Sequence, residues 1–177
     1  AFASMTVGTV LQNAMPVFGN MLAGATDPDL MYGYLLFALG AGAVLGGLAL
    51  EVTGWVQPNV RAVVGATITL GVFAALFSLT RSPAIALGLL FLTGISHITA
   101  ESVGMAIVQL EAPRDQRGRV IGSYSMFGPG MRSFSGVIVG ALGAFMGLPA
   151  TVFAGGVILA VATIVAVGVI RPGIRQS

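Results

Sequence analysis

Long apolar stretches separated by short polar breaks are the feature that most constrains how this chain can fold. A membrane-spanning helix needs about 20 mostly apolar residues to cross about 30 Å of hydrocarbon. Six stretches of the 177-residue chain fit that requirement: 5–25, 31–50, 62–79, 83–110, 120–146 and 149–170. The pattern predicts an all-α, polytopic membrane protein in which residues 1–177 form a single bundle of six transmembrane helices.

The composition supports this class and excludes several others. Charged residues make up 8% of the chain, against about 25% in soluble domains, so they are too few to coat a water-facing surface. A membrane barrel would need segments of about ten residues with alternating polarity, and runs such as 154–170 are apolar on all sides. Eight scattered arginines and a net charge of +2 give no basic stripe for nucleic acid.

The sequence also lacks the motifs of catalytic and metal sites. With no cysteine and one histidine, neither a cysteine-ligated metal nor a paired-histidine metalloprotease site is expected. No Gly-x-Ser-x-Gly nucleophile motif occurs. We therefore expect no enzymatic activity, no metal and no cofactor.

Arginine placement predicts how the chain is oriented in the membrane. Arg61, Arg114, Arg117 and Arg119 fall on the side of the two termini, and Arg81 falls on the opposite side. Cytoplasmic loops carry the excess of positive residues. Both termini are therefore expected in the cytoplasm, with the chain in the cell inner or plasma membrane.

Polar side chains inside the predicted spans gather on the first, fourth and fifth of them. Such groups are costly in lipid and face the bundle interior or a water-filled path. The substrate-path candidates are Gln12, Asn13, Asn20, Thr93, Ser125 and Ser135. For the amides of the first span, interhelical hydrogen bonding is the alternative role. Bends are expected where helix-breaking residues interrupt a span, at Pro16, Gly128, Pro129 and Gly130.

His97, Glu101 and Arg132 are expected to form one buried polar cluster. Thr93, His97 and Glu101 are spaced four apart and share one helical face. Counted from the cytoplasmic ends of their spans, His97 and Arg132 lie at about the same depth, roughly 20 Å. Two roles stay open: a proton-coupling site, since such groups can take up and release protons near neutral pH, or a fixed polar link between helices.

Glycine pairs four residues apart predict close contacts between helices, because small residues at this spacing let helices approach closely in lipid. The pairs are Gly42 with Gly46, Gly136 with Gly140, and Gly143 with Gly147. The spans 62–79 and 149–170 hold the fewest polar side chains, so these two are expected to face lipid.

The junction between the fourth and fifth spans carries Gln109 near a helix end, then Pro113, then the triplet Arg117-Gly118-Arg119. This stretch, 107–122, resembles the junction of the tenth and eleventh helices in major facilitator superfamily transporters, nearest to the bacterial drug- and siderophore-exporter branch. Residues 123–143, rich in Gly and Ser, are similar to the eleventh helix. The resemblance implies that the chain is the C-terminal half, helices seven to twelve, of a twelve-helix protein. It also implies that helices seven, eight, ten and eleven line the central path.

The function predicted from these features is secondary active transport by alternating access, as a proton-coupled efflux antiporter for a small amphipathic molecule. The expected partners are the lipid bilayer, an N-terminal six-helix half and the small-molecule substrate, with no nucleic acid. The alternative from another class is a non-transport membrane subunit, serving as an anchoring or assembly bundle.

Overall fold

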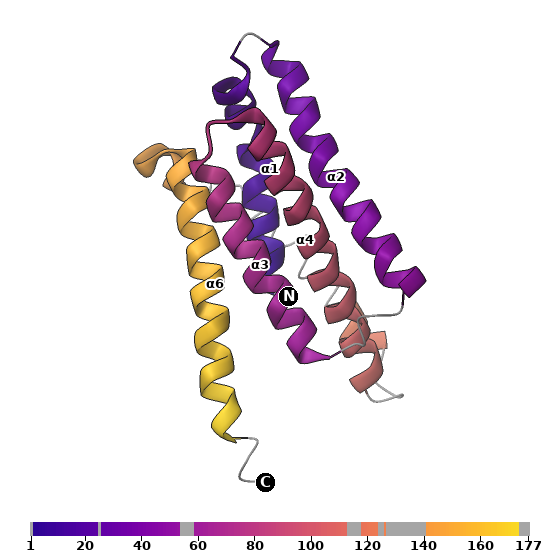
Figure 1. Cartoon of the computed structure of the whole chain (residues 1–177). Coiled ribbons are helices and arrows are strands. Elements are labelled where there is room, and N and C mark those ends of the chain that lie inside the picture. Colours follow the sequence, from indigo (N-terminus) through magenta and orange to yellow (C-terminus); the bar gives the residue numbers. More distant parts are fainter. Residues whose placement is uncertain are drawn as a thin grey trace.

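The computed structural model shows a bundle of long helices that run up and down past one another (Figure 1). It describes residues 2–24, 26–53, 59–112, 118–123, 126 and 141–173, without the side chains of 2–6, 53 and 169–173. The long helices are α1 (Phe2–Leu22), α2 (Pro28–Thr53), α3 (Val60–Leu79), α4 (Pro83–Glu111) and α6 (Leu148–Gly173). No strand occurs among the described residues, which confirms the all-helical class for them.

Observed helix ends lie within three residues of the predicted ones, as with α2, predicted at 31–50 and observed at Pro28–Thr53. The difference there is that Pro28 and Asp29, expected in a turn, belong to the helix. Proline suits a first helical position because its missing N–H has no helical partner there. The Asp27 carboxylate accepts the backbone N–H of Asp29 at 2.8 Å, which helps to cap the helix start.

The other described helix ends follow from similar local chemistry. The Asn59 side chain accepts the backbone N–H of Ala62 at 2.8 Å and caps α3. Gly147 has a φ of +81°, a conformation that glycine adopts without steric cost, and it makes the turn just before α6. α1 continues through Pro16 as far as Leu22, and the bend predicted at that proline stays a prediction.

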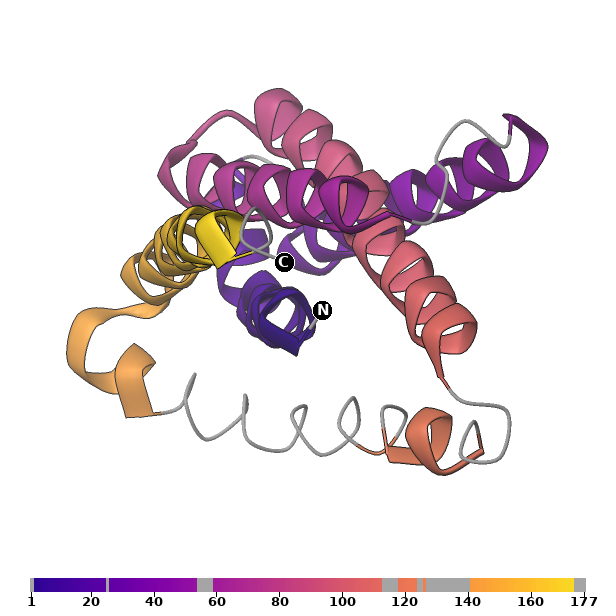
Figure 2. The same ribbon diagram turned by 90° about the horizontal axis from the view of Figure 1, so that it is seen from below.

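Four of the helices form a row in the order α2, α4, α3, α6, and α1 packs across one face of it, touching all four. Figure 2, seen along the helices, shows α1 beside this row. Core side chains of α1 include Leu11, Met15 and Phe18, which are nearly fully buried. The ring of Phe18 packs on that of Phe77 from α3, with centroids 4.6 Å apart. α1 is thus the element that joins both ends of the row.

Glycines bring two pairs of helices in the row into backbone contact. A Cβ on Gly42 of α2 would collide with the Phe91 carbonyl of α4, and a Cβ on Gly46 would lie 3.0 Å from the Cα of Ile95. The close approach predicted for this pair is confirmed. On α3 and α6, Gly71 and Gly156 face each other: a Cβ on either would come within 2.6 Å of the other's carbonyl oxygen. That second contact was not predicted.

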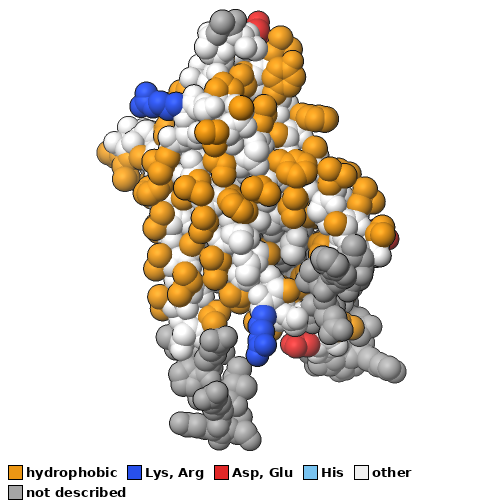
Figure 3. Space-filling view, viewed as in Figure 1, with side chains coloured by type: hydrophobic (Ala, Val, Ile, Leu, Met, Phe, Trp, Pro, Cys, Tyr) orange, Lys and Arg blue, Asp and Glu red, His pale blue; other side chains and the backbone are white. Residues whose placement is uncertain are grey.

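The surface of the helices is largely apolar, and the charged atoms visible in Figure 3 lie toward their two ends. Four described helices are long and apolar enough to cross a membrane: α2, α3, α4 and α6. α1 is not among them; it carries Gln12, Asn13 and Asn20 within its 21 residues. The predicted number of six spans therefore stays a prediction, since 120–146 is described only at 120–123, 126 and 141–146.

Candidate functional site

α4 carries an acid–imidazole pair halfway along its length. His97 lies 14 residues from both Pro83 and Glu111, or roughly 21 Å from each end at 1.5 Å per residue. Its Nδ1 lies 3.8 Å from Oε2 of Glu101, one turn further along. That separation allows an ion pair when His97 is protonated and is too long for a hydrogen bond. The two side chains are 19% and 31% exposed, so the pair is partly accessible in this chain.

Glu101 is isolated from the other described charges. Asp27, Asp29 and Arg81 lie at one end of the helices, near the α1–α2 and α3–α4 connections. The remainder lie at the opposite end: Glu51, Arg61, Glu111 and Arg119. Glu101 is thus the one described Asp, Glu or Arg side chain in the middle of a long helix. A lone carboxylate at that depth is a candidate functional group in a membrane protein.

Thr93, the third member of the predicted stripe, lies one turn before His97 and is 1% exposed. Its hydroxyl donates a hydrogen bond of 2.7 Å to the Leu89 carbonyl of the same helix. This bond to the preceding turn uses the hydroxyl proton, and the hydroxyl oxygen can still accept a hydrogen bond. The stripe therefore passes from a buried hydroxyl to a partly exposed carboxylate.

The His97 ring lies directly against the backbone of α1 at Gly8. A Cβ on Gly8 would collide with Nε2 of the ring and would lie 2.7 Å from its Cδ2. Any side chain larger than hydrogen at this position therefore requires the ring to move. Sequence reasoning missed Gly8, because nothing in a single sequence relates it to a residue 89 positions later.

A cavity of about 280 Å³ lies between α1, α2 and α4, beside this contact. α1 contributes Gly8, Leu11 and Gln12 to its walls, and α4 contributes Thr93, Gly94 and His97. α2 contributes mainly apolar residues and Gly40. Three residues predicted from the sequence, Gln12, Thr93 and His97, thus come together around one space, whereas Glu101 lies next to it.

The other predicted polar residues of α1 have different places. Asn13 and Asn20 are exposed, and neither lines the cavity. The Asn20 amide donates a 3.0 Å hydrogen bond to the Pro16 carbonyl of the same helix. Their predicted contact with a substrate stays a prediction.

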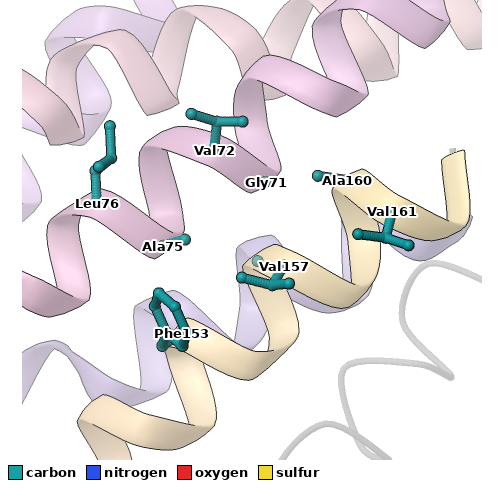
Figure 4. Close-up of a pocket in the computed structure, with 9 residues that line it drawn as sticks. Gly71, Val72, Ala75, Leu76, Phe153, Val157, Ala160 and Val161 are labelled. Atoms are coloured by element: carbon teal, nitrogen blue, oxygen red, sulfur yellow. The ribbon is translucent and has the colours of Figure 1, made fainter. Parts of the chain in front are cut away.

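A second hollow of about 190 Å³ lies along the contact of α3 and α6 (Figure 4). Gly71 and Ala75 of α3 and Gly156 and Ala160 of α6 form its floor, and larger side chains such as Phe153 flank it. Its lining residues are all apolar or glycine, so it holds no group that could bind a proton or a metal. This agrees with the low polarity predicted for the two helices.

Several predicted residues fall outside the described part of the chain. They are Arg114, Arg117, Ser125, Gly128, Pro129, Gly130, Arg132, Ser135, Gly136 and Gly140. The proposed contact of Arg132 with Glu101 is therefore untested. Arg61 and Arg119 are described and exposed. Within the described residues, no group of three or more His, Cys, Asp or Glu side chains is arranged to hold a metal ion.

Comparison with known proteins gives one result that covers nearly the whole chain. The model of a major facilitator superfamily family described as "Transmembrane secretion effector" matches residues 14–175. No curated protein gives a significant match, and no solved structure does. The match covers α2, α3, α4 and α6 in full, together with the C-terminal part of α1 from residue 14 onward.

Proposed function

The chain belongs to the transmembrane secretion effector family of the major facilitator superfamily, a family of multi-pass membrane transporters, and from this premise we propose that it forms the C-terminal half of a proton-coupled exporter. The exporter moves a small amphipathic molecule by alternating access, as an antiporter of the drug- and siderophore-exporter type. An N-terminal six-helix half completes the transport path. Transporters built of such halves bind substrate near mid-membrane, where the halves meet.

The observation that carries this proposal is the His97–Glu101 pair at the middle of α4. Carboxylates and imidazoles are the side chains that exchange protons in transporters; here the two groups lie 3.8 Å apart and are partly exposed, and His97 lines a cavity. Among the described residues, Thr69 and Ser96 make a side-chain hydrogen bond that links α3 and α4.

The orientation proposed for the chain follows from its exposed arginines. Arg61 and Arg119 lie at the end of the bundle where α4 finishes, and Arg81 lies at the other end. With Arg114 and Arg117 in the same connection as Arg119, we place that end in the cytoplasm. The membrane is then the cell inner or plasma membrane, and export runs away from the arginine-rich end.

The coupling role is tested by Glu101→Gln in the full-length protein, with Glu111→Gln as the matched control on the same helix. Inverted membrane vesicles with an acidic lumen are supplied with the neutral amphipathic dye N-phenyl-1-naphthylamine. Glu101→Gln is expected to lower gradient-driven accumulation about tenfold or more, because it removes an ionisable group from mid-membrane. Glu111→Gln, at a helix end, keeps the wild-type rate.

A second readout separates coupling from damage to the protein. Exchange of dye between vesicle interior and exterior without a pH gradient should continue in Glu101→Gln, since binding and alternating access do not need the carboxylate's proton. Full gradient-driven accumulation by Glu101→Gln would contradict the coupling role. Absence of any accumulation by the wild-type protein, over a wider panel of amphipathic dyes, would favour the anchoring or assembly bundle instead.

A further inference from the structure

We propose that the cavity between α1, α2 and α4 binds a compact, neutral, mostly apolar molecule that carries one hydrogen-bonding group, and that Gly40 limits the size of that molecule. This inference rests on the proposed transport function and adds a substrate class to it. The bound species is either a whole small substrate or the apolar end of a larger one.

The cavity volume sets the size class. At about 280 Å³, the space lies near the lower limit of small-molecule sites, which is about 300 Å³. An apolar protein cavity of about 150 Å³ is enough to hold benzene. One aromatic ring with a short substituent therefore fits, whereas a fused polycyclic compound would have to extend out past the exposed residues Gln12 and Gly40.

The lining sets the polarity class. Seven of the ten lining residues are apolar or glycine, and Gln12, Thr93 and His97 are polar. No Asp, Glu or Arg is among the described residues that line it. An anion would find the His97 imidazole as the one lining group that can become cationic, and it would approach the Glu101 carboxylate 3.8 Å from that ring. A neutral hydroxyl or amide, in contrast, can bond with the Gln12 amide, the imidazole or the lone pairs of Thr93.

The three glycines of the wall differ in what surrounds them. A Cβ on Gly8 would collide with His97, and a Cβ on Gly94 would collide with the Leu39 carbonyl. A Cβ on Gly40 would meet no atom within 4 Å. Gly40 is therefore the lining glycine that can be enlarged without displacing the helices. Because it lines the cavity together with Leu36 and Ala43 of the same helix, we expect the added atoms to reduce the cavity. Gly33, two helical turns earlier on α2, is also open within 4 Å and does not line the cavity.

The test measures binding of 4-fluorobenzyl alcohol to the full-length protein in lipid nanodiscs by ¹⁹F NMR, with empty nanodiscs as the blank for partitioning into lipid. Wild type and Gly33→Leu are expected to bind saturably with equal affinity. Gly40→Leu is expected to bind about tenfold or more weakly, since a single methylene in an apolar pocket changes affinity by about that factor. Thermal melting of each variant confirms that the two leucine proteins are folded, and Gly40→Ala gives an intermediate point should Gly40→Leu fail to fold.

Polarity is tested with two further probes. 4-Fluorotoluene, which lacks the hydroxyl, and 4-fluorobenzoate, which carries a charge, should both bind more weakly than the alcohol. Equal binding of the alcohol to wild type and Gly40→Leu, no saturable binding to wild type, or tightest binding of the benzoate would overturn the proposal.

The binding measurement uses no gradient, so it is independent of proton coupling. Saturable, Gly40-dependent binding together with unimpaired uphill transport by Glu101→Gln would refute the coupling role and leave the pocket standing. No saturable binding to the wild type, together with loss of uphill transport in Glu101→Gln, would refute the pocket and leave the coupling role standing.

Discussion

The contact between α3 and α6 and the contact between α1 and α4 both depend on glycine, yet they differ in what the glycine faces. Gly71 and Gly156 each lie against the other helix's backbone, and the surrounding side chains are apolar. Gly8 lies against the imidazole of His97, and a partly polar cavity adjoins the contact. In the α3–α6 contact, backbone packs on backbone, and no side chain there can change rotamer. In the α1–α4 contact, backbone packs on the His97 side chain, which can change rotamer.

This difference matters because apolar burial does not draw helices together in lipid. Association there depends on van der Waals packing and hydrogen bonds. The α3–α6 contact is of the packing type, and it should hold its geometry during a transport cycle. The α1–α4 contact places a titratable ring where the packing is adjustable, so we expect changes in proton binding or ligand binding to be transmitted there.

Of the substitutions that test this comparison, Gly156→Leu is expected to have the largest effect, a loss of folding stability. Gly156→Leu forces a side chain into the Gly71 carbonyl and the backbone of Ala75, and overpacking of this kind costs about 1–3 kcal/mol, or more where the backbone must move. We expect a loss of about 3 kcal/mol or failure to fold, measured by unfolding of the full-length protein in lipid. Gly168→Leu, on the same helix with nothing within 4 Å of its Cβ, should be nearly neutral. Equal stability of the two variants would show that the contact between α3 and α6 is not tightly packed at Gly156.

Gly8→Ala is expected to lower folding stability less than Gly156→Leu does, and its main effect should be on transport. The three atoms nearest to the added methyl of Gly8→Ala all belong to the far end of the flexible His97 side chain, so the ring can turn away at a cost of about 1 kcal/mol. Gradient-driven dye accumulation should fall several-fold while exchange without a gradient continues. Gly88→Ala on α4, where the Cβ is in open space, is the control. Unchanged accumulation by Gly8→Ala would mean that the ring's position against α1 has no part in coupling.

Much of the fold follows from the sequence because the signals are local. Apolar runs and breaking residues place the described helix ends to within three residues, as at Val60–Leu79 against the predicted 62–79. The spacing of Gly42 and Gly46 predicts their contact with α4. The same spacing of small residues occurs in Gly71 with Ala75 and in Gly156 with Ala160, so that contact was also open to prediction.

The candidate site could be predicted only in part, because its members come from three helices. Helical spacing on α4 relates Thr93, His97 and Glu101, but it does not say which of them borders a cavity. Gly8 and Gly40 have no polar group to mark them, and their roles depend on helices that meet only in the folded bundle. Asn20 shows the opposite case, since a residue selected for its polarity bonds to its own helix at Pro16.

The central claim is that the α1–α4 side faces a water-accessible path while the outer side of α6 faces lipid. This chain has no cysteine, so single cysteines can be placed in it, and any cysteine elsewhere in the full-length protein is first replaced by serine. Gln12 at the middle of α1 and Ile158 on α6 are both exposed in the chain alone, Ile158 at 66%. In membranes holding the full-length protein, a membrane-impermeant maleimide should label Gln12→Cys and leave Ile158→Cys unlabelled. Labelling of Ile158→Cys with Gln12→Cys protected, in vesicles of either orientation, would contradict the account.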